Sequence, residues 1–433
     1  MNGLSFFAIL VTLAAVFGMV NYRLLRVHVS TGVLIIALAV SALAIAIDPL
    51  LAPFSFRQLA ESLLHTVNLP STLMNGALAF LLFAGSMHVD LGELLRRKWT
   101  VLALATFGVL IAVAVFGLGI WGVFHLLGVP VAVIWCLVLG AILAPTDPVS
   151  VVGLLQRLGL PPSFRAIFAG EALFNDGVGV VVFSVLMGIA TADGQLETAA
   201  GVISSFVIEA FGGAALGFAT GWVALRMMRR VDEYNLELII SLALATGTYS
   251  LANTLHLSAP IAVVVAGLAM GSNAGRTAMS EITHHHVTTF WSLIDELLVT
   301  LLFLLIGLEV VSVPLHGLDL AAAAIAIPLA LVARAISIAV PGTLLRLHDV
   351  IGLHALALLT WGGLRGGISV ALALSLPEGA PRQHLLPACY AVVVFTIIAQ
   401  GLSMPRLVRV CSKSVEAAAA KSRGSTAAEQ VSS

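Results

Sequence analysis

Long apolar runs recur along almost the whole chain of 433 residues. A helix of about 20 apolar residues is long enough to cross a bilayer. Because lipid cannot satisfy backbone hydrogen bonds, each such run is expected to be helical. The sequence therefore predicts an all-α polytopic membrane protein with about thirteen transmembrane helices, at residues 4–20, 32–47, 66–86, 100–127, 130–154, 163–190, 198–225, 235–255, 258–273, 287–311, 318–341, 350–376 and 386–408.

The overall composition excludes a pair of soluble domains. Hydrophobic residues make up 60% of the chain and charged residues 10%, whereas soluble domains average about 25% charged residues. The cysteines Cys136, Cys389 and Cys411 are scattered, without disulfide or metal-site spacing. We expect no cofactor, no metal other than a transported ion, and no nucleic-acid partner.

The basic residues are distributed unevenly between the two sides of this predicted topology. All but four of the 21 lysines and arginines fall on one side, which the positive-inside rule assigns to the cytoplasm. Arg57 and Arg382 fall on the other side, while Arg334 and Arg365 lie within predicted spans. We expect a bacterial inner membrane protein with its N-terminus outside and its C-terminus inside. Residues 1–411 would form one transmembrane domain, followed by a short disordered tail over 412–433.

The fifth predicted span is interrupted by polar residues between two prolines. Pro145 and Pro148 flank Thr146 and Asp147, and proline lacks the amide hydrogen that a helix needs. Asp147 followed by proline also matches the N-cap and first residue of a new half-helix. The pattern predicts a discontinuous helix, as in the binding sites of secondary transporters. The alternative is a simple proline kink with Asp147 as a buried cap.

A second interruption is expected late in the chain, because such transporters are built from inverted repeats. The twelfth span contains four glycines around Arg365, in the segment 361–367, and glycine weakens a helix. The fifth and twelfth spans then occupy matching positions in two repeats, spans 4–6 and 11–13.

Two carboxylates and an amide lie close together in the sixth span. Glu171 and Asn175 are four residues apart and share a helix face, whereas Asp176 is turned roughly 140° from Glu171. A buried carboxylate without a cation partner binds a proton, which suits a group that exchanges a proton for a cation. We assign that exchange to Asp176, and an ion pair with Arg334 of the eleventh span to Glu171. The alternative exchanges the roles of the two carboxylates.

These residues give the chain a resemblance to the monovalent cation:proton antiporter-1 family, the NhaP-type and NHE-type sodium/proton exchangers. The resemblance covers nearly all of the predicted spans. Its motifs are Thr146-Asp147-Pro148, Glu171 to Asp176 against the family's E-S-L-x-N-D, Phe303 to Glu309, Ala333-Arg334-Ala335, and Gly362 to Gly366.

The resemblance implies exchange of a monovalent cation, Na⁺ or else K⁺ or Li⁺, for a proton. It implies that Asp176 binds both ions, that Thr146 and Asp147 flank the cation, and that Arg365 offsets helix-end charge. It further implies a homodimer in which a core, including spans 4–6 and 11–13, moves against a scaffold.

Three positions bear on the details of that exchange. Asn175 before Asp176 is typical of electroneutral members, which exchange one cation for one proton. Ala172 replaces the motif's serine, and Ala84 stands where many members have a glutamate. Both replacements remove oxygen atoms that hard cations prefer, so the preferred cation stays open.

Other function classes fit the sequence less well. An intramembrane aspartyl protease needs two aspartates that share a proton, and Asp147 and Asp176 supply the number. The sequence lacks the Tyr-Asp and Gly-x-Gly-Asp contexts of such enzymes. A cation channel would not need a titratable Asp176. We therefore expect a transporter and not an enzyme, with the channel as the main alternative.

Two further groups receive weaker assignments. Asp295 and Glu296 are expected to face water near the end of the tenth span, with an ion-entry funnel as the alternative. His284, His285 and His286 are expected in a solvated cytoplasmic loop, with a pH sensor as the alternative.

Overall fold

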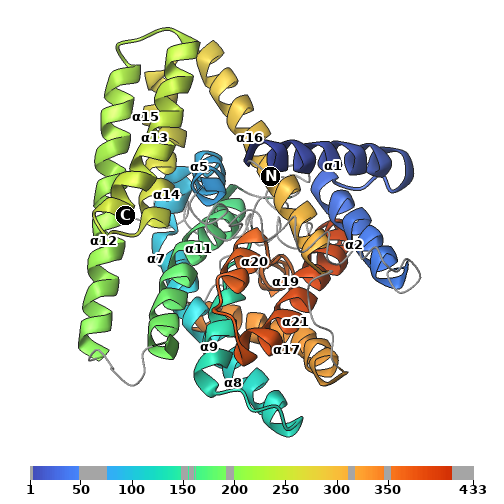
Figure 1. The fold of residues 1–433 in the computed structure, drawn as a ribbon. Helices are drawn as coiled ribbons and strands as arrows, with labels where there is room; N and C mark the ends of the chain where they lie inside the picture. The colour runs from blue at the N-terminus through green and yellow to red at the C-terminus, as the bar shows by residue number, and fades with distance from the viewer. Residues whose placement is uncertain are drawn as a thin grey trace.

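A computed structural model of the chain describes residues 3–47, 76–147, 155, 160, 162–191, 199–310, 317–345 and 353–411. These residues are entirely helical and connecting structure, with no strand among them (Figure 1). The helices are α1 (Gly3–Leu24), α2 (Val29–Ile47), α5 (Leu78–Met87), α6 (Leu91–Arg96), α7 (Lys98–Ala103), α8 (Val109–Leu126), α9 (Val133–Ile142), α11 (Pro162–Thr191), α12 (Ala199–Met228), α13 (Tyr234–Thr254), α14 (Ala259–Gly271), α15 (Asn273–Ala278), α16 (Glu281–Glu309), α17 (Gly317–Leu344), α19 (Leu353–Trp361), α20 (Gly367–Leu374) and α21 (Ala380–Phe395), with π-helical turns at η3 (Leu104–Gly108) and η5 (Thr396–Gln400).

The all-α membrane class is confirmed, and the helices follow the predicted spans closely. Nine helical segments among the described residues are long and apolar enough to cross a membrane, and α5, α9 and α14 are shorter apolar helices. The span predicted at 163–190 is α11, and those at 235–255 and 318–341 lie on α13 and α17. The total of thirteen spans stays a prediction. The tail over 412–433 lies outside the described residues.

The helices pack in two groups, with α11 between them. One group pairs α12 with α14 and α13, and α14 with α5, while the other pairs α8 with α9 and α17, and α17 with α21. Helix α11 contacts α9 of the second group and α14 of the first, as well as α6 and α7 (Figure 1). Residues on α11 are therefore placed where the two groups meet.

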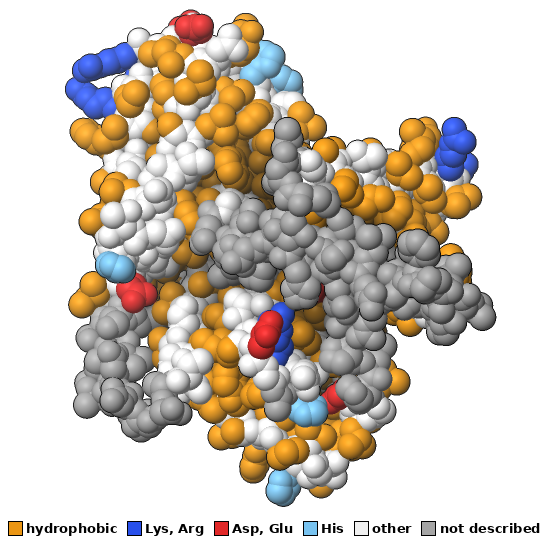
Figure 2. All heavy atoms as spheres, in the orientation of Figure 1, with side chains coloured by type: hydrophobic (Ala, Val, Ile, Leu, Met, Phe, Trp, Pro, Cys, Tyr) orange, Lys and Arg blue, Asp and Glu red, His pale blue; other side chains and the backbone are white. Residues whose placement is uncertain are grey.

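The outside of the molecule is apolar. Phe211, Phe218 and Trp222 on α12 are 73%, 65% and 57% exposed. Figure 2 shows a largely hydrophobic face with scattered charged side chains. A soluble monomer rarely exposes apolar surface on this scale, whereas a lipid-facing surface requires it.

Candidate functional site

The irregular segment after α9 and the interruption between α19 and α20 meet at the centre of the site. Helix α9 ends at Ile142, and residues 143–147 are not α-helical; α19 ends at Trp361, and α20 begins at Gly367. The backbone N–H of Asp147 donates a 2.8 Å hydrogen bond to the carbonyl of Leu364. The two irregular segments therefore satisfy each other's backbone groups, which lipid could not do. Pro148 and the half-helix predicted after it lie outside the described residues, so the N-cap role of Asp147 stays a prediction.

Arg365 lies against the carbonyl groups that follow α9. Its side chain is buried, and Nη1 donates to the carbonyls of Ala144 at 2.7 Å and Pro145 at 3.2 Å. A cation at this position opposes the partial negative charge of a helix C-terminus. The backbone N–H of Arg365 donates to Oγ1 of Thr396 at 3.1 Å. Thr396 belongs to the site although the sequence analysis did not single it out, because a lone threonine in an apolar span carries no motif.

Glu171 and Arg334 form a buried, two-pronged ion pair between α11 and α17. Arg334 donates from Nη1 to Oε1 at 2.8 Å and from Nη2 to Oε2 at 2.9 Å. Nη2 also donates to the carbonyl of Leu359 at 3.3 Å, which links the pair to the second interrupted helix. Charge-assisted bidentate pairs are among the strongest polar contacts in proteins.

Asn175 connects this ion pair to the first interrupted helix. Its Nδ2 donates to Oε1 of Glu171 at 2.9 Å and to Oγ1 of Thr146 at 2.8 Å. Its Oδ1 accepts a 3.3 Å hydrogen bond from the backbone N–H of Thr146. The side chain is completely buried. An amide is suited to this place because it donates to a carboxylate and accepts from a backbone amide at once.

Asp176 lines a small cavity beside the crossing. The cavity has a volume of about 50 Å³ and is also lined by Thr146, Asp147 and Gly366. Asp176 is 4% exposed, and its Oδ1 has no hydrogen-bond partner among the described residues. A space of this size exceeds the ~15 Å³ that one water needs. A buried carboxylate oxygen beside such a space can bind a proton or a cation with oxygen ligands.

Helix α5 closes the cavity with apolar groups. Leu81, Leu82 and Gly85 line it, and Ala84 is fully buried. Ala172 on α11 is also buried. The described side chains around the cavity therefore offer oxygen atoms from Asp176, Asp147 and Thr146.

The expectation that Asp295 faces water near a helix end was wrong. Asp295 is buried in the middle of α16, and its Oδ1 has no partner in the described part of the chain. The hydropathy pattern began this span at residue 287, but Ser280 caps the helix by accepting from the N–H of Thr283. Glu296, the next residue, is exposed as expected.

The histidines also lie in this helix and not in a loop. His284, His285 and His286 belong to the first turns of α16. The ring of His286 lies 5.1 Å from that of Tyr234 on α13, measured between centroids. The prediction of a loop was wrong because polar residues extend a helix beyond its apolar part.

Comparison with known proteins identifies the family. Residues 9–410 match the family model described as the transmembrane sodium/hydrogen exchanger. The Na⁺/H⁺ antiporter NhaP of Pseudomonas aeruginosa is 41% identical over 410 residues, which cover 94% of this chain and 96% of that protein. The Na⁺/H⁺ antiporter NhaH of Halobacillus dabanensis is 34% identical over 78% of this chain and 83% of its own length.

A solved structure shows the same fold. The sodium proton antiporter MjNhaP1 from Methanocaldococcus jannaschii at pH 8 superposes with a TM-score of 0.71, over 93% of this chain and 97% of that one, at 19% identity. The fold agrees with the match of the family model over almost the entire length, and the chain belongs to the sodium/hydrogen exchanger family.

Proposed function

We propose that this protein is a secondary transporter that exchanges a monovalent cation for a proton, with Asp176 as the shared binding group. The observation that carries the proposal is the Oδ1 of Asp176, which has no hydrogen-bond partner among the described residues and is buried beside a cavity lined by Asp147 and Gly366. The relatives named as Na⁺/H⁺ antiporters make Na⁺ the first candidate, with K⁺ and Li⁺ as further candidates. The two ions compete because a carboxylate that holds a proton has lost the charge that attracts a cation.

The surrounding residues would keep this one group free to exchange. Arg334 satisfies both oxygens of Glu171, so Glu171 stays ionised and acts as a structural partner. Asn175 is neutral and holds Thr146 against α11. Thr146 and Asp147 would flank the cation, and Arg365 would offset the helix-end charge after α9.

The stoichiometry and the membrane arrangement follow from the same assignment. With one exchanging carboxylate beside a neutral Asn175, one proton leaves for each cation that binds, and transport is electroneutral. The two sides of the membrane would be reached in turn by movement of a core, including spans 4–6 and 11–13, within a homodimer in the bacterial inner membrane. The physiological role would be cation expulsion or pH homeostasis.

The proposal is tested by proton movement in proteoliposomes of the purified chain. Wild type should acidify or alkalinise the lumen when an Na⁺, K⁺ or Li⁺ gradient is imposed, and Asp176→Asn should abolish this movement. Asp232→Asn removes an exposed carboxylate between α12 and α13 and should behave as wild type.

Two outcomes would reject the exchange. The assay would cover pH values between about 6 and 9. If the wild-type protein moves no protons in response to a cation gradient at any of these pH values, it is not an antiporter. Undiminished cation flux in Asp176→Asn would instead indicate a channel, since a conducting pore does not require a titratable group at this position.

A further inference from the structure

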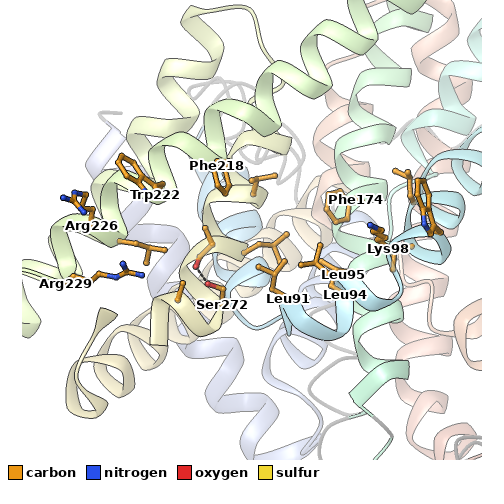
Figure 3. A pocket seen from close by; sticks show the side chains of 18 residues that line it. Leu91, Leu94, Leu95, Lys98, Phe174, Phe218, Trp222, Arg226, Arg229 and Ser272 are labelled. Carbon is orange, nitrogen blue, oxygen red and sulfur yellow. Dashed lines mark hydrogen bonds between the residues drawn. The ribbon is translucent and has the colours of Figure 1, made fainter. Parts of the chain in front are cut away.

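A second cavity, much larger than the first, lies between α12 and α14 on one side and α6, α7 and α11 on the other. It has a volume of about 790 Å³. Figure 3 shows Phe218, Trp222 and Arg226 of α12 on one side, with Arg229 from the turn that follows this helix. On the other side are Leu91, Leu94 and Leu95 of α6 with Lys98 of α7, and Phe174 of α11 (Figure 3). The proposed exchange residues do not line this cavity.

The charged side chains that line this cavity are all positive. Lys98, Arg226 and Arg229 contribute three cations, and no carboxylate is among its described lining residues. Arg226 lies over the ring of Trp222, with its guanidinium carbon 5.9 Å from the ring centroid. Lys98 lies over Trp99 at 5.6 Å. The remainder of the wall is almost entirely apolar, so the cavity suits a molecule that has an anionic head and a hydrocarbon body.

The dimensions of the cavity match one leaflet of a bilayer. Arg229, in the turn directly after α12, follows Phe218 of α12 by eleven residues, which corresponds to roughly 16 Å along a helix. Half of the hydrocarbon core of a bilayer is about 15 Å. Arg229 therefore lies about one leaflet away from Phe218 in this direction. Trp99 and Trp222 are 70% and 57% exposed beside Lys98 and Arg226, as is typical of tryptophan at a membrane interface.

We propose that this cavity binds an anionic phospholipid, with its phosphate on Arg226 and Arg229 and its acyl chains between α12 and α6; Lys98 lies at the other end of the cavity (Figure 3). Basic pockets between transmembrane helices commonly recognise anionic head groups. Phe174 lines the cavity and lies two residues before Asp176. A bound acyl chain thus contacts the helix that carries the proposed exchange site and also the neighbouring helix group. This inference does not depend on the identity of the transported cation.

The test compares lipid binding by two triple variants of the purified full chain. Lys98→Gln/Arg226→Gln/Arg229→Gln removes the three cations of the cavity. Arg96→Gln/Arg97→Gln/Arg230→Gln removes the same total charge from neighbouring positions that do not line it. Each protein in detergent is titrated with phosphatidylglycerol or phosphatidylcholine, and native mass spectrometry and the melting temperature report binding.

We expect phosphatidylglycerol to raise the melting temperature of wild type and of the control variant more than phosphatidylcholine does. One cation near a head group contributes about 5-fold in affinity, so the cavity variant, which lacks both phosphate-binding arginines, should bind phosphatidylglycerol on the order of 25-fold more weakly. Val265→Trp narrows the apolar wall with all three cations retained and should also weaken binding of this lipid.

Three results would overturn the proposal. Equal loss of binding in both triple variants would indicate diffuse surface attraction. Stabilisation of wild type by inorganic phosphate, equal to that by phosphatidylglycerol, would indicate an anion site without acyl chains. Unchanged lipid binding by the cavity variant would show that the lipid lies elsewhere.

Discussion

At the scale of single residues, Glu171 and Asp176 lie five residues apart on one helix but have different hydrogen-bond partners and therefore different proposed roles. Both carboxylates are buried on α11. Glu171 receives both prongs of Arg334 and the amide of Asn175, whereas Oδ1 of Asp176 has no partner among the described residues. Glu171 thus has a cation partner, whereas no described group is bound to Oδ1 of Asp176. The contrast is what qualifies Asp176, and not Glu171, for exchange.

Removal of Arg334 should destabilise the fold more than it alters ion selectivity. Arg334→Ala leaves Glu171 buried with an unpaired charge, and breaking a buried pair in this way costs about 3–5 kcal/mol. Folded yield and melting temperature in detergent should fall. The double variant Glu171→Gln/Arg334→Met should recover much of the loss, because no buried charge remains. Normal stability of Arg334→Ala would show that the pair is not structural.

The sequence singled out most residues of the site, because intramembrane charges and prolines stand out against an apolar background. Asp147, Glu171, Asp176, Arg334 and Arg365 were all candidates on that ground. Thr396 and the burial of Asp295 were missed. Threonine is common in apolar spans, and the position of Asp295 depended on the N-cap at Ser280, which lies outside the hydrophobic window.

At the scale of elements, proline by itself does not explain the interruption after α9. Helix α17 contains Pro328 and Pro341 in its interior and continues through both. After α9 the carbonyls of Ala144 and Pro145, which have left the helix, accept hydrogen bonds from Arg365. The two interruptions therefore depend on each other, and no local sequence pattern could show that they touch.

The glycines of the second interruption are needed for close approach. A methyl group on Gly363 would lie 2.5 Å from Nε of Arg334, and one on Gly366 would lie 2.9 Å from Cβ of Asp147. The sequence analysis interpreted these glycines as helix breakers, but their neighbours across the fold require them as well. Packing partners of this kind are set by tertiary structure and are not visible in sequence.

Gly363→Ala should therefore destabilise the protein through the Arg334 guanidinium. Overpacking of this kind costs about 1–3 kcal/mol, and the melting temperature should fall. Gly122→Ala on α8 is the matched control, because a methyl group there would have no described atom within 4 Å apart from its chain neighbours and the backbone of its own helix. Alanine also favours a helix over glycine, so the control should be neutral or slightly more stable. An equal effect of the two substitutions would contradict the close approach.

At the scale of the whole molecule, the class and the helix positions followed from hydropathy, because a bilayer imposes length and apolarity on every span. Hydropathy did not predict which helices pack against each other, because a lipid-facing apolar surface and a buried one look alike in sequence. The end positions of helices also shifted where polar residues extend them, as at α16, which begins at Glu281.

The predicted topology places the two termini on opposite sides of the membrane. An odd number of predicted spans separates the termini, and the excess of lysine and arginine on one side marks that side as cytoplasmic. A reporter that is active only in the cytoplasm should function when fused to the C-terminus and fail when fused to the N-terminus. Activity at both ends would require an even number of spans and would overturn the assignment.

The central claim is that a single carboxylate, Asp176, binds a cation and a proton in turn. Competition for one group requires the apparent KM for the cation to rise about tenfold for each unit of decreasing pH in the acidic range, at constant maximal rate. The decisive measurement is the KM for Na⁺ in proteoliposomes across a pH series. The account predicts this tenfold slope; a KM that does not change with pH would contradict it.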